Sequence, residues 1–287
     1  MDNSKFITIN NNKIHYIEKG QGENTILFLH GLPISSYVWR NIIPTLSSKA
    51  MCIAPDLIGM GRSDKPSKYG AVEHLRDIKI FIEKLQLTNI TLVLHGFGSF
   101  IGFNYAMNNP NNIKGIAFYE PHLCPFNNTD KQSLPIQELI YLFQQKPNYS
   151  YKKIVEDNFL INKLLPSMVI RKLDDDVQKL YQTPFINLED RKTIWHLFED
   201  FYLNNDSTNK INEYIINYSS FLQKSSIPKL LLYNIPGFNT SMAMIKWCKN
   251  NLPNIKLADL EEGIHLAPET NPRLFSAILL DWYNKIL

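Results

Sequence analysis

The chain has 287 residues, of which 44% are hydrophobic, so it contains enough apolar side chains for one large core. Its 30 lysine and arginine residues nearly balance its 27 aspartate and glutamate residues, and the formal net charge is only +3. These charges are spread along the chain, which argues against binding to nucleic acid or to a membrane surface. We therefore expect the partner to be a small molecule.

Three cysteines, Cys52, Cys124 and Cys248, are widely spaced and odd in number, which is atypical of a disulfide framework or of a metal site. We expect them to be buried in a protein from a reducing compartment. The first residues lack the basic and apolar order of a secretory signal, and no apolar run approaches the roughly 20 residues that cross a bilayer. The sequence predicts a cytoplasmic protein without a metal or a cofactor, and it gives no indication of oligomeric state.

The first predicted element is an antiparallel hairpin over residues 7–19, with the polar residues Asn10 to Asn12 as its turn. Apolar residues at helical spacing follow over 73–87, and a second helix is expected to begin near Gly98. Runs rich in β-branched residues predict strands on either side of these helices. The runs cover residues 24–31, 50–57, 89–96, 113–120, 228–235 and 255–266. Such alternation indicates an α/β fold with a mostly parallel sheet.

The strand pattern stops between the predicted strands at 113–120 and 228–235, where the sequence becomes helical and rich in aromatic and aliphatic residues. We interpret residues 121–226 as a helical cap, inserted into a core formed by residues 1–120 and 227–287. Insertions of this kind lie over the carboxyl ends of the strands, where open α/β sheets bind ligands. The substrate pocket is therefore expected between the cap and the sheet.

Three parts of the chain carry a family resemblance: His30–Pro33 with Ser35–Arg40, Ala54–Pro66, and short motifs in the cap. Together they resemble the α/β-hydrolases of the haloalkane dehalogenase type. The resemblance implies an α/β-hydrolase fold, with a mostly parallel eight-stranded sheet, flanking helices and an inserted helical cap. Coelenterazine-type luciferases share this scaffold, so the resemblance does not fix the reaction.

The resemblance also implies a catalytic triad of an aspartate nucleophile, a glutamate and a histidine. Glu120 aligns with the glutamate and His265 with the histidine, but Gly96 stands where the family has its aspartate. The family's two halide-binding side chains, a tryptophan and an asparagine, are replaced by Phe97 and Leu32, neither of which can donate a hydrogen bond from its side chain. Covalent dehalogenation would therefore lack its nucleophile and its halide donors.

The residues that remain support a different chemistry. A histidine oriented by a carboxylate is a general base, so His265 and Glu120 could activate a nucleophile other than a protein side chain. The backbone N–H groups of Phe97 and Leu32 could still form an oxyanion hole, and Gly96 leaves space for a water molecule. We therefore expect a cofactor-independent enzyme that performs hydrolysis, elimination or cyclisation on a small apolar substrate.

Two alternatives stay open. Glycine relieves the backbone strain of the tight turn at position 96, so Gly96 is also consistent with a catalytically inactive protein that binds a small molecule. Residual haloalkane dehalogenase activity is the other alternative. Turnover that disappears in a His265→Ala variant would favour the enzyme, whereas a modest change in affinity without any product would favour the binding protein.

Four further residues are expected to line the substrate pocket: His122, which lies two residues after Glu120, and the cap residues Phe159, Leu164 and Phe185. The alternative is that the aromatic side chains of the cap belong to its core, which is the commoner place for aromatic residues on helices. The orientation of His122, toward the ligand or away from it, is left open by the sequence.

Overall fold

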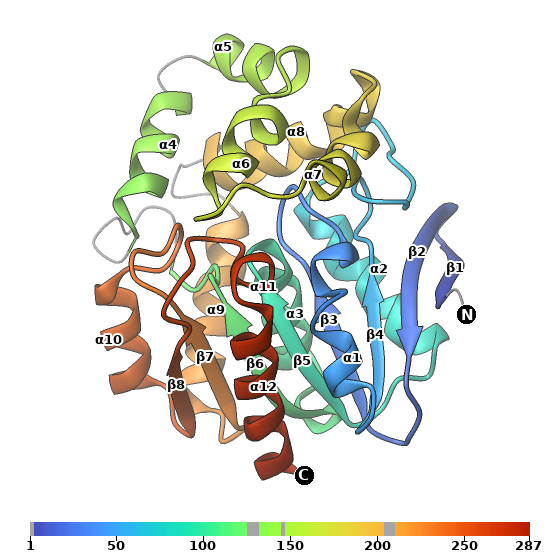
Figure 1. Cartoon of the computed structure of the whole chain (residues 1–287), viewed down its shortest axis with the longest axis vertical. Helices are drawn as coiled ribbons and strands as arrows, with labels where there is room; N and C mark the ends of the chain where they lie inside the picture. The colour runs from blue at the N-terminus through green and yellow to red at the C-terminus, as the bar shows by residue number, and fades with distance from the viewer. Residues whose placement is uncertain (1–2, 125–131, 145–146, 204–209) are drawn as a thin grey trace.

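The computed structural model describes residues 3–124, 132–144, 147–203 and 210–287. Its strands form one eight-stranded sheet in the order β1-β2-β4-β3-β5-β6-β7-β8 (Figure 1). The strands are β1 (Ser4–Ile9), β2 (Asn12–Lys19), β3 (Thr25–Leu29), β4 (Met51–Pro55), β5 (Ile90–His95), β6 (Ile113–Tyr119), β7 (Lys229–Tyr233) and β8 (Ile255–Asp259). From β4 to β8 in this order all neighbours are parallel. The predicted eight-stranded, mostly parallel sheet is confirmed.

The hairpin at the sheet edge closes through a two-residue turn. Asn10 and Asn11 both have positive φ angles, of 47° and 68°, which asparagine tolerates better than most residues. Strand β1 pairs antiparallel with β2, and β2 pairs antiparallel with β4. The predicted hairpin is therefore confirmed, although Asn12 is the first residue of β2 and not part of the turn.

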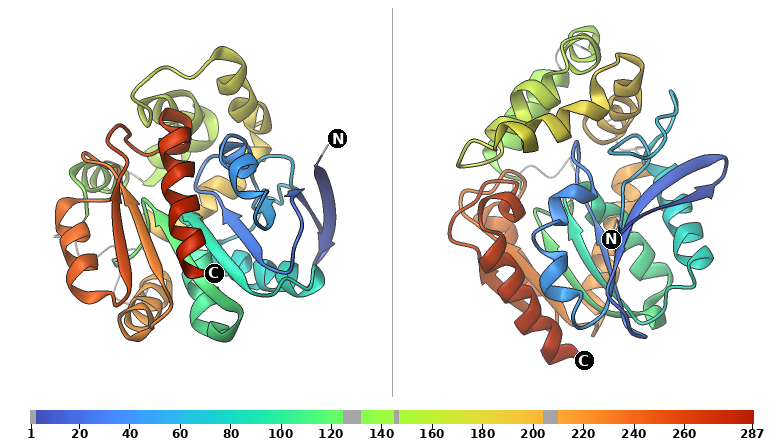
Figure 2. Two further views of the ribbon diagram at one scale, coloured as in Figure 1. Left: turned by 60° about the horizontal axis from the view of Figure 1, so that its bottom comes forward. Right: turned by 45° about the vertical axis from the view of Figure 1, so that its right-hand side comes forward.

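Alternate residues of the central strands belong to two separate hydrophobic cores, because successive side chains point to opposite faces of a sheet. In β3, Leu27 and Leu29 join the core on one face, while Ile26 and Phe28 join the core on the other. Helices cover both faces (Figures 1 and 2). They are η1 (Ser36–Trp39), α1 (Ile43–Leu46), α2 (Ala71–Lys84), α3 (Phe97–Asn108), η2 (Pro110–Asn112), α10 (Met242–Asn251), α11 (Ala267–Thr270) and α12 (Pro272–Ile286).

In its described parts, the segment between β6 and β7 consists of helices joined by turns and coil, with one isolated β-bridge from Gln132 to Thr240, and its helices up to η8 gather at one end of the sheet (Figure 2). Its elements are α4 (Leu134–Gln144), α5 (Pro147–Tyr151), η4 (Lys152–Glu156), η5 (Leu160–Leu164), α6 (Leu165–Ser167), α7 (Asp175–Gln182), η6 (Thr183–Phe185), η7 (Glu189–Arg191), α8 (Lys192–Phe198), η8 (Glu199–Leu203) and α9 (Lys210–Lys224).

The last helix of this segment, α9, packs against α3 and so belongs with the helices that flank the sheet. The Tyr218 ring lies 5.4 Å from that of Phe103, and the Tyr214 ring lies 6.0 Å from that of Phe100. The cap predicted at 121–226 therefore includes one helix that does not cover the strand ends. Its amphipathic sequence alone could not distinguish packing on the cap from packing on the core.

None of the helices in the described segments combines the length and the apolar composition that crossing a bilayer requires. The three cysteines are buried and carry free thiols, as expected from the sequence. The cytoplasmic location stays a prediction.

Candidate active site

The centre of the site is the tight turn between β5 and α3. Strand β5 ends at His95, α3 begins at Phe97, and Gly96 between them has a φ of 49° and a ψ of −120°. Its N–H donates to the carbonyl of Tyr119 on β6 (3.2 Å), and its carbonyl accepts from the N–H and the hydroxyl of Ser99 (2.9 and 2.7 Å). Such a φ strains any residue except glycine, so this turn is a place where Gly96 relieves strain.

There is room beside Gly96 for a side chain. A β-carbon added to this glycine would lie 3.6 Å from Nε2 of His265 and 3.4 Å from the α-carbon of Gly31, both ordinary contact distances. The space that the missing side chain leaves therefore faces the imidazole of His265.

The imidazole of His265 is fixed by a buried carboxylate. Its Nδ1–H donates to Oε2 of Glu120 over 2.9 Å, and the side chains are 5% and 0% exposed. The same carboxylate accepts the backbone N–H groups of Asn239 and Thr240 (2.5 and 3.1 Å). Three donors thus compensate for the burial of the Glu120 charge, which would otherwise be costly. They leave Nε2 of His265 as an acceptor, without a partner among the described residues.

Two asparagines hold the loops that carry this pair. The side-chain amide of Asn239 donates to the carbonyl of Glu120 (3.0 Å), while that of Asn234 donates to the carbonyl of Gly263, two residues before His265 (2.5 Å). The sequence gave no sign of Asn239 or of the Thr240 N–H. Backbone donors in a coil have no sequence signature, which explains why they were missed.

Gly237 gives a test of how tightly the Glu120 carboxylate is enclosed. A β-carbon there would lie 2.5 Å from Oε1 of Glu120 and 2.6 Å from the carbonyl oxygen of Thr240, both too close for real contacts. We expect Gly237→Ala to lower the free energy of unfolding by about 1–3 kcal/mol, as overpacking does. Thermal unfolding would measure this loss. Glu23→Ala, at an exposed loop position, is the control; an equal loss in both variants would contradict the expectation.

His122 also faces the site. Its side chain lines the same cavity as that of His265, its N–H donates to the hydroxyl of Ser99 (2.8 Å), and its carbonyl accepts from the hydroxyl of Tyr218. Burial lowers the pKa of His122 to about 3, with a further contribution from nearby His265. His122 is therefore a neutral imidazole near pH 7. Ser99 links it to the turn at Gly96, in keeping with a packing role for this serine.

A cavity of about 40 Å³ lies between the cap and the strand ends, large enough for a water molecule. Most of its wall is apolar, and its polar side chains come from two histidines, one asparagine and one tyrosine. The lining residues are Leu32, Pro33, Gly96, Phe97, His122, Leu139, Leu160, Leu164, Met168, Phe198, Tyr202, Phe238, Asn239 and His265. The structure thus brings Leu32, Phe97, His122 and Leu164 together with His265, as the sequence analysis expected.

Phe159 and Phe185, also expected to line the pocket, are not among the lining residues. The Phe159 ring packs on that of Phe143, with centroids 6.0 Å apart, and Phe185 is only 1% exposed. The carbonyl of Phe185 accepts hydrogen bonds from Asn158 and Arg191 (3.2 and 2.8 Å). The expectation was wrong for these two residues, because their side chains fill the interior of the cap, as the alternative proposed.

Part of the cavity wall consists of π-helical turns. Leu160 and Leu164 are the first and last residues of η5, and Tyr202 lies in η8; both elements are π-helical. π-Helical turns are rare and are often found at functional sites. Their presence around this cavity supports a functional role for it.

Two backbone N–H groups at the cavity are free to bind an anion. Phe97 is the first residue of the 12-residue helix α3, and Leu32 lies in the loop after β3; both line the cavity. Neither N–H has an acceptor in the described parts of the chain. The positive end of the α3 dipole adds to the potential at this point. These two groups are candidates for stabilising a developing oxyanion.

The side chains that surround the cavity offer few groups to a metal or a cofactor. In the parts of the chain that the structure describes, no group of three histidine, cysteine, aspartate or glutamate side chains is arranged to hold a metal ion. The acidic group nearest to the cavity, Glu120, is already bonded to His265, Asn239 and Thr240.

A mostly parallel sheet, a tight turn after a central strand and a histidine–carboxylate pair together are typical of the α/β-hydrolase fold. A family model described as the alpha/beta hydrolase fold matches residues 24–235. The chain belongs to the α/β-hydrolase fold family.

Within that family the chain is similar to haloalkane dehalogenases over almost its whole length. It is 32% identical to a haloalkane dehalogenase from Agrobacterium fabrum, and the alignment covers 96% of this chain and 89% of that relative. It is 30% identical to one from Mesorhizobium japonicum, and that alignment covers 98% of this chain and 91% of the relative. The crystal structure of the haloalkane dehalogenase DatA from Agrobacterium tumefaciens superposes with a TM-score of 0.91, at 29% identity, over 99% of this chain and 97% of that one. The crystal structure of the haloalkane dehalogenase DbeA from Bradyrhizobium elkani has a TM-score of 0.92 at 26% identity, and the superposition covers 99% of this chain and 98% of that one.

Proposed function

We propose that this protein is a cofactor-independent hydrolase that activates water with His265 and cleaves a small, largely apolar ester without forming a covalent intermediate. One observation carries the proposal: Nε2 of His265 points toward the space beside Gly96 and has no partner among the described residues, while Glu120 holds the other side of the ring. The family resemblance puts a nucleophilic aspartate at position 96, and glycine has no side-chain atom for that step.

In the proposed reaction, a water molecule beside Gly96 donates a hydrogen bond to Nε2 of His265. As its oxygen attacks the ester carbonyl, the water transfers a proton to Nε2, and the Glu120 carboxylate stabilises the resulting imidazolium. The carbonyl oxygen becomes an oxyanion that accepts from the N–H groups of Phe97 and Leu32. Collapse of the tetrahedral intermediate breaks the bond to the alkoxide, which takes the proton back from His265.

The walls of the cavity support a small acyl or alkyl group as the substrate. Leucine, methionine and phenylalanine side chains dominate its lining, and the space of about 40 Å³ is smaller than a typical ligand pocket. Binding of anything larger than a few heavy atoms requires side chains of the cap to move. Elimination and cyclisation would use the same base, and their products distinguish them from hydrolysis.

The test is a series of p-nitrophenyl esters from acetate to octanoate, assayed with the wild-type protein in water enriched in ¹⁸O. We expect turnover of the short esters, ¹⁸O in the carboxylate product after a single turnover, and an unchanged protein mass during the reaction. An acyl or alkyl adduct on the protein would contradict direct attack by water. A loss of the substrate without incorporation of ¹⁸O would point to elimination or cyclisation.

A second candidate, residual haloalkane dehalogenase activity, is favoured by the names of the relatives that cover almost the whole chain. We expect no halide release from 1-bromobutane by the wild-type protein, because no side chain at position 96 can form the alkyl ester. The triple variant Gly96→Asp, Phe97→Trp, Leu32→Asn would restore the nucleophile and two donors. We expect it to release bromide above background in a halide assay, with the double variant that retains Gly96 as the control.

A third candidate is a catalytically inactive binding protein. It is favoured by the relief of strain at Gly96 and by the small cavity, which leaves little room for a substrate in this conformation. This candidate predicts that His265→Ala changes the affinity for a ligand modestly and that no ester in the series is hydrolysed.

A further inference from the structure

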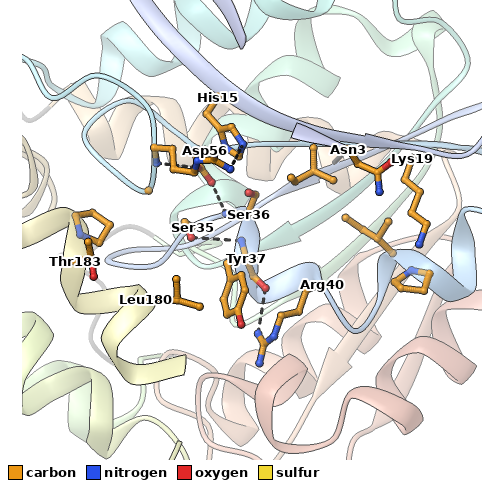
Figure 3. A pocket seen from close by; sticks show the side chains of 16 residues that line it. Asn3, His15, Lys19, Ser35, Ser36, Tyr37, Arg40, Asp56, Leu180 and Thr183 are labelled. Atoms are coloured by element: carbon orange, nitrogen blue, oxygen red, sulfur yellow. Dashed lines mark hydrogen bonds and ion pairs between the residues drawn. The ribbon is translucent and has the colours of Figure 1, made fainter. Parts of the chain in front are cut away.

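A second and much larger cavity lies away from His265. Its volume is about 610 Å³, within the range of small-molecule sites, and it shares no lining residue with the cavity at Gly96. Its walls come from β2, from the segment of η1 and α1, from the loop after β4 and from the cap turn of α7 and η6 (Figure 3). The lining residues are Asn3, His15, Ile17, Lys19, Ser35, Ser36, Tyr37, Arg40, Ile43, Pro44, Asp56, Gly61, Arg62, Leu180, Thr183 and Pro184.

One wall of this cavity is a fully bonded polar network. The carboxylate of Asp56 accepts from Nδ1–H of His15 (2.7 Å) and from the backbone N–H groups of Ser36 and Arg62 (both 2.8 Å). Burial alone would raise the pKa of Asp56, but the hydrogen bond and charge of His15 outweigh it and hold the pKa below its ordinary value. The negative charge of Asp56 is therefore already compensated, and it offers little repulsion to an anion in the cavity.

The cations of the cavity exceed its acids. Lys19, Arg40 and Arg62 line it together with a single carboxylate, Asp56. Arg40 forms a two-bond ion pair with Glu269, at 2.5 and 2.7 Å. Lys19 has no ion pair or hydrogen bond to its side chain among the described residues. Its ammonium group is therefore free to pair with an anionic ligand.

The rest of the lining combines hydroxyl-bearing side chains with aliphatic ones. Ile17 of β2 and Ile43 of α1 contribute aliphatic surface on the core side, and Leu180 of α7 contributes it on the cap side, where it is 50% exposed. In Figure 3, Lys19 and Asn3 lie at one side of the cavity and Leu180 at the opposite side. A ligand that spans the cavity would meet Lys19 and Asn3 at one end, with Ile17 beside Lys19 because both lie on one face of β2, and Leu180 at the other end.

We propose that this cavity binds a small amphipathic carboxylate, with its anionic group at Lys19 and Asn3 and its aliphatic chain running past Ile17 and Ile43 to Leu180. Charge complementarity supplies the selectivity for an anion, and burial of the chain supplies most of the affinity. This site is separate from the candidate active site and does not rest on its proposed chemistry.

The experiment is isothermal titration calorimetry of the full chain with octanoate, and with octan-1-ol as the uncharged ligand of equal chain length. We expect saturable binding of octanoate, about fivefold tighter than that of octan-1-ol, because one partly exposed ion pair contributes on the order of 1 kcal/mol. Lys19→Met should weaken the binding of octanoate by a similar factor and leave the affinity for octan-1-ol unchanged. Leu180→Asp should weaken the binding of both ligands. Lys249 is an exposed lysine on α10, and Lys249→Met should change neither affinity.

The outcomes separate this site from the active site. Unchanged octanoate affinity in His265→Gln would support the proposal, whereas a loss there would place the ligand in the cavity at Gly96. Equal affinities for octanoate and octan-1-ol, absence of saturable binding, or octanoate affinity unaffected by Lys19→Met would each overturn it. Ester hydrolysis in the Lys19→Met variant should equal that of the wild type, so failure of this proposal leaves the proposed hydrolase unaffected.

Discussion

Replacement of His265 by glutamine is expected to lower kcat/KM for ester hydrolysis by about 10³-fold, the middle of the range for loss of a general base. Glutamine has a similar size and its amide can still hydrogen-bond to Glu120, so the loss would come from the chemistry and not from collapse of the site. Initial rates with p-nitrophenyl acetate over a range of concentrations would measure it. Because the contribution of a base arises in the transition state, kcat should fall and KM should change little.

His196→Gln is the matched control for this experiment. His196 lies on α8 in the cap, its side chain is 32% exposed, and it does not line the cavity at Gly96. We expect its rate to equal that of the wild type. The kcat/KM of Glu120→Gln should lie between those of His265→Gln and His196→Gln, because the base remains but the imidazolium loses its compensating charge. Equal activity of His265→Gln and wild type would remove the basis of the proposed mechanism.

Acid is expected to destabilise the protein through histidines that are buried in their neutral form, and His74 is the clearest case. It is 1% exposed, and its ring packs at nearly right angles on those of Tyr69 and Phe97, with centroids 4.6 and 5.1 Å away. Its Nε2 has no hydrogen-bond partner in the part of the chain that the structure describes. Burial lowers the pKa of His74 to about 3. In the unfolded chain a histidine has a pKa of about 6.5.

The sign of the effect follows from these two values. Between pH 6.5 and about 3 the unfolded chain binds a proton at His74 and the folded protein does not. The free energy of unfolding therefore falls as the pH falls through this window, by up to about 1.4 kcal/mol per pH unit for this one group. The contribution of the neutral ring is fully present above pH 6.5 and is lost near pH 3.

His74→Phe should flatten this dependence, because phenylalanine fills nearly the same space and cannot bind a proton. Urea unfolding of both proteins at pH 7, 6, 5 and 4 would measure the free energies, and we expect the difference between variant and wild type to grow in favour of the variant as the pH falls. Histidines such as His122 remain in both proteins, so their contributions cancel. Parallel curves over this range would show that His74 does not contribute as expected.

The sheet could be predicted because its strands are marked by the sequence itself. All residues of β3 and β5 are buried, and strands buried on both faces form continuous apolar runs. The positions of the cap side chains were harder to predict, because apolar and aromatic residues on its helices can line the cavity or fill the cap interior. Leu164 lines the cavity while Phe159 and Phe185 fill the cap interior, and only the packing of the helices against one another decides between these positions.

Some residues of the candidate site could be predicted from the sequence and others could not. Glu120 and His265 were recognised because they align with the glutamate and the histidine of the resembling family, near the ends of the strands predicted at 113–120 and 255–266. Asn239 was not, because it contributes through a backbone N–H in a coil. The larger cavity could not be predicted from the sequence, because its lining includes His15, Asp56 and Leu180, which are far apart along the chain and share no sequence pattern.

The π-helical turns of the cap have a consequence for how the pocket could be reshaped. A π turn holds about one residue more than the α turn it replaces, so removing a single residue from η5 would convert it to α-helix with little loss of hydrogen bonding. Because the π turn already absorbs the extra residue, the residues after the deletion would keep nearly the same position around the helix axis. The turn between Leu160 and Leu164, which lines the cavity, would instead become one residue shorter, so changes of chain length, and not only of side-chain size, offer a route to altered ligand preference.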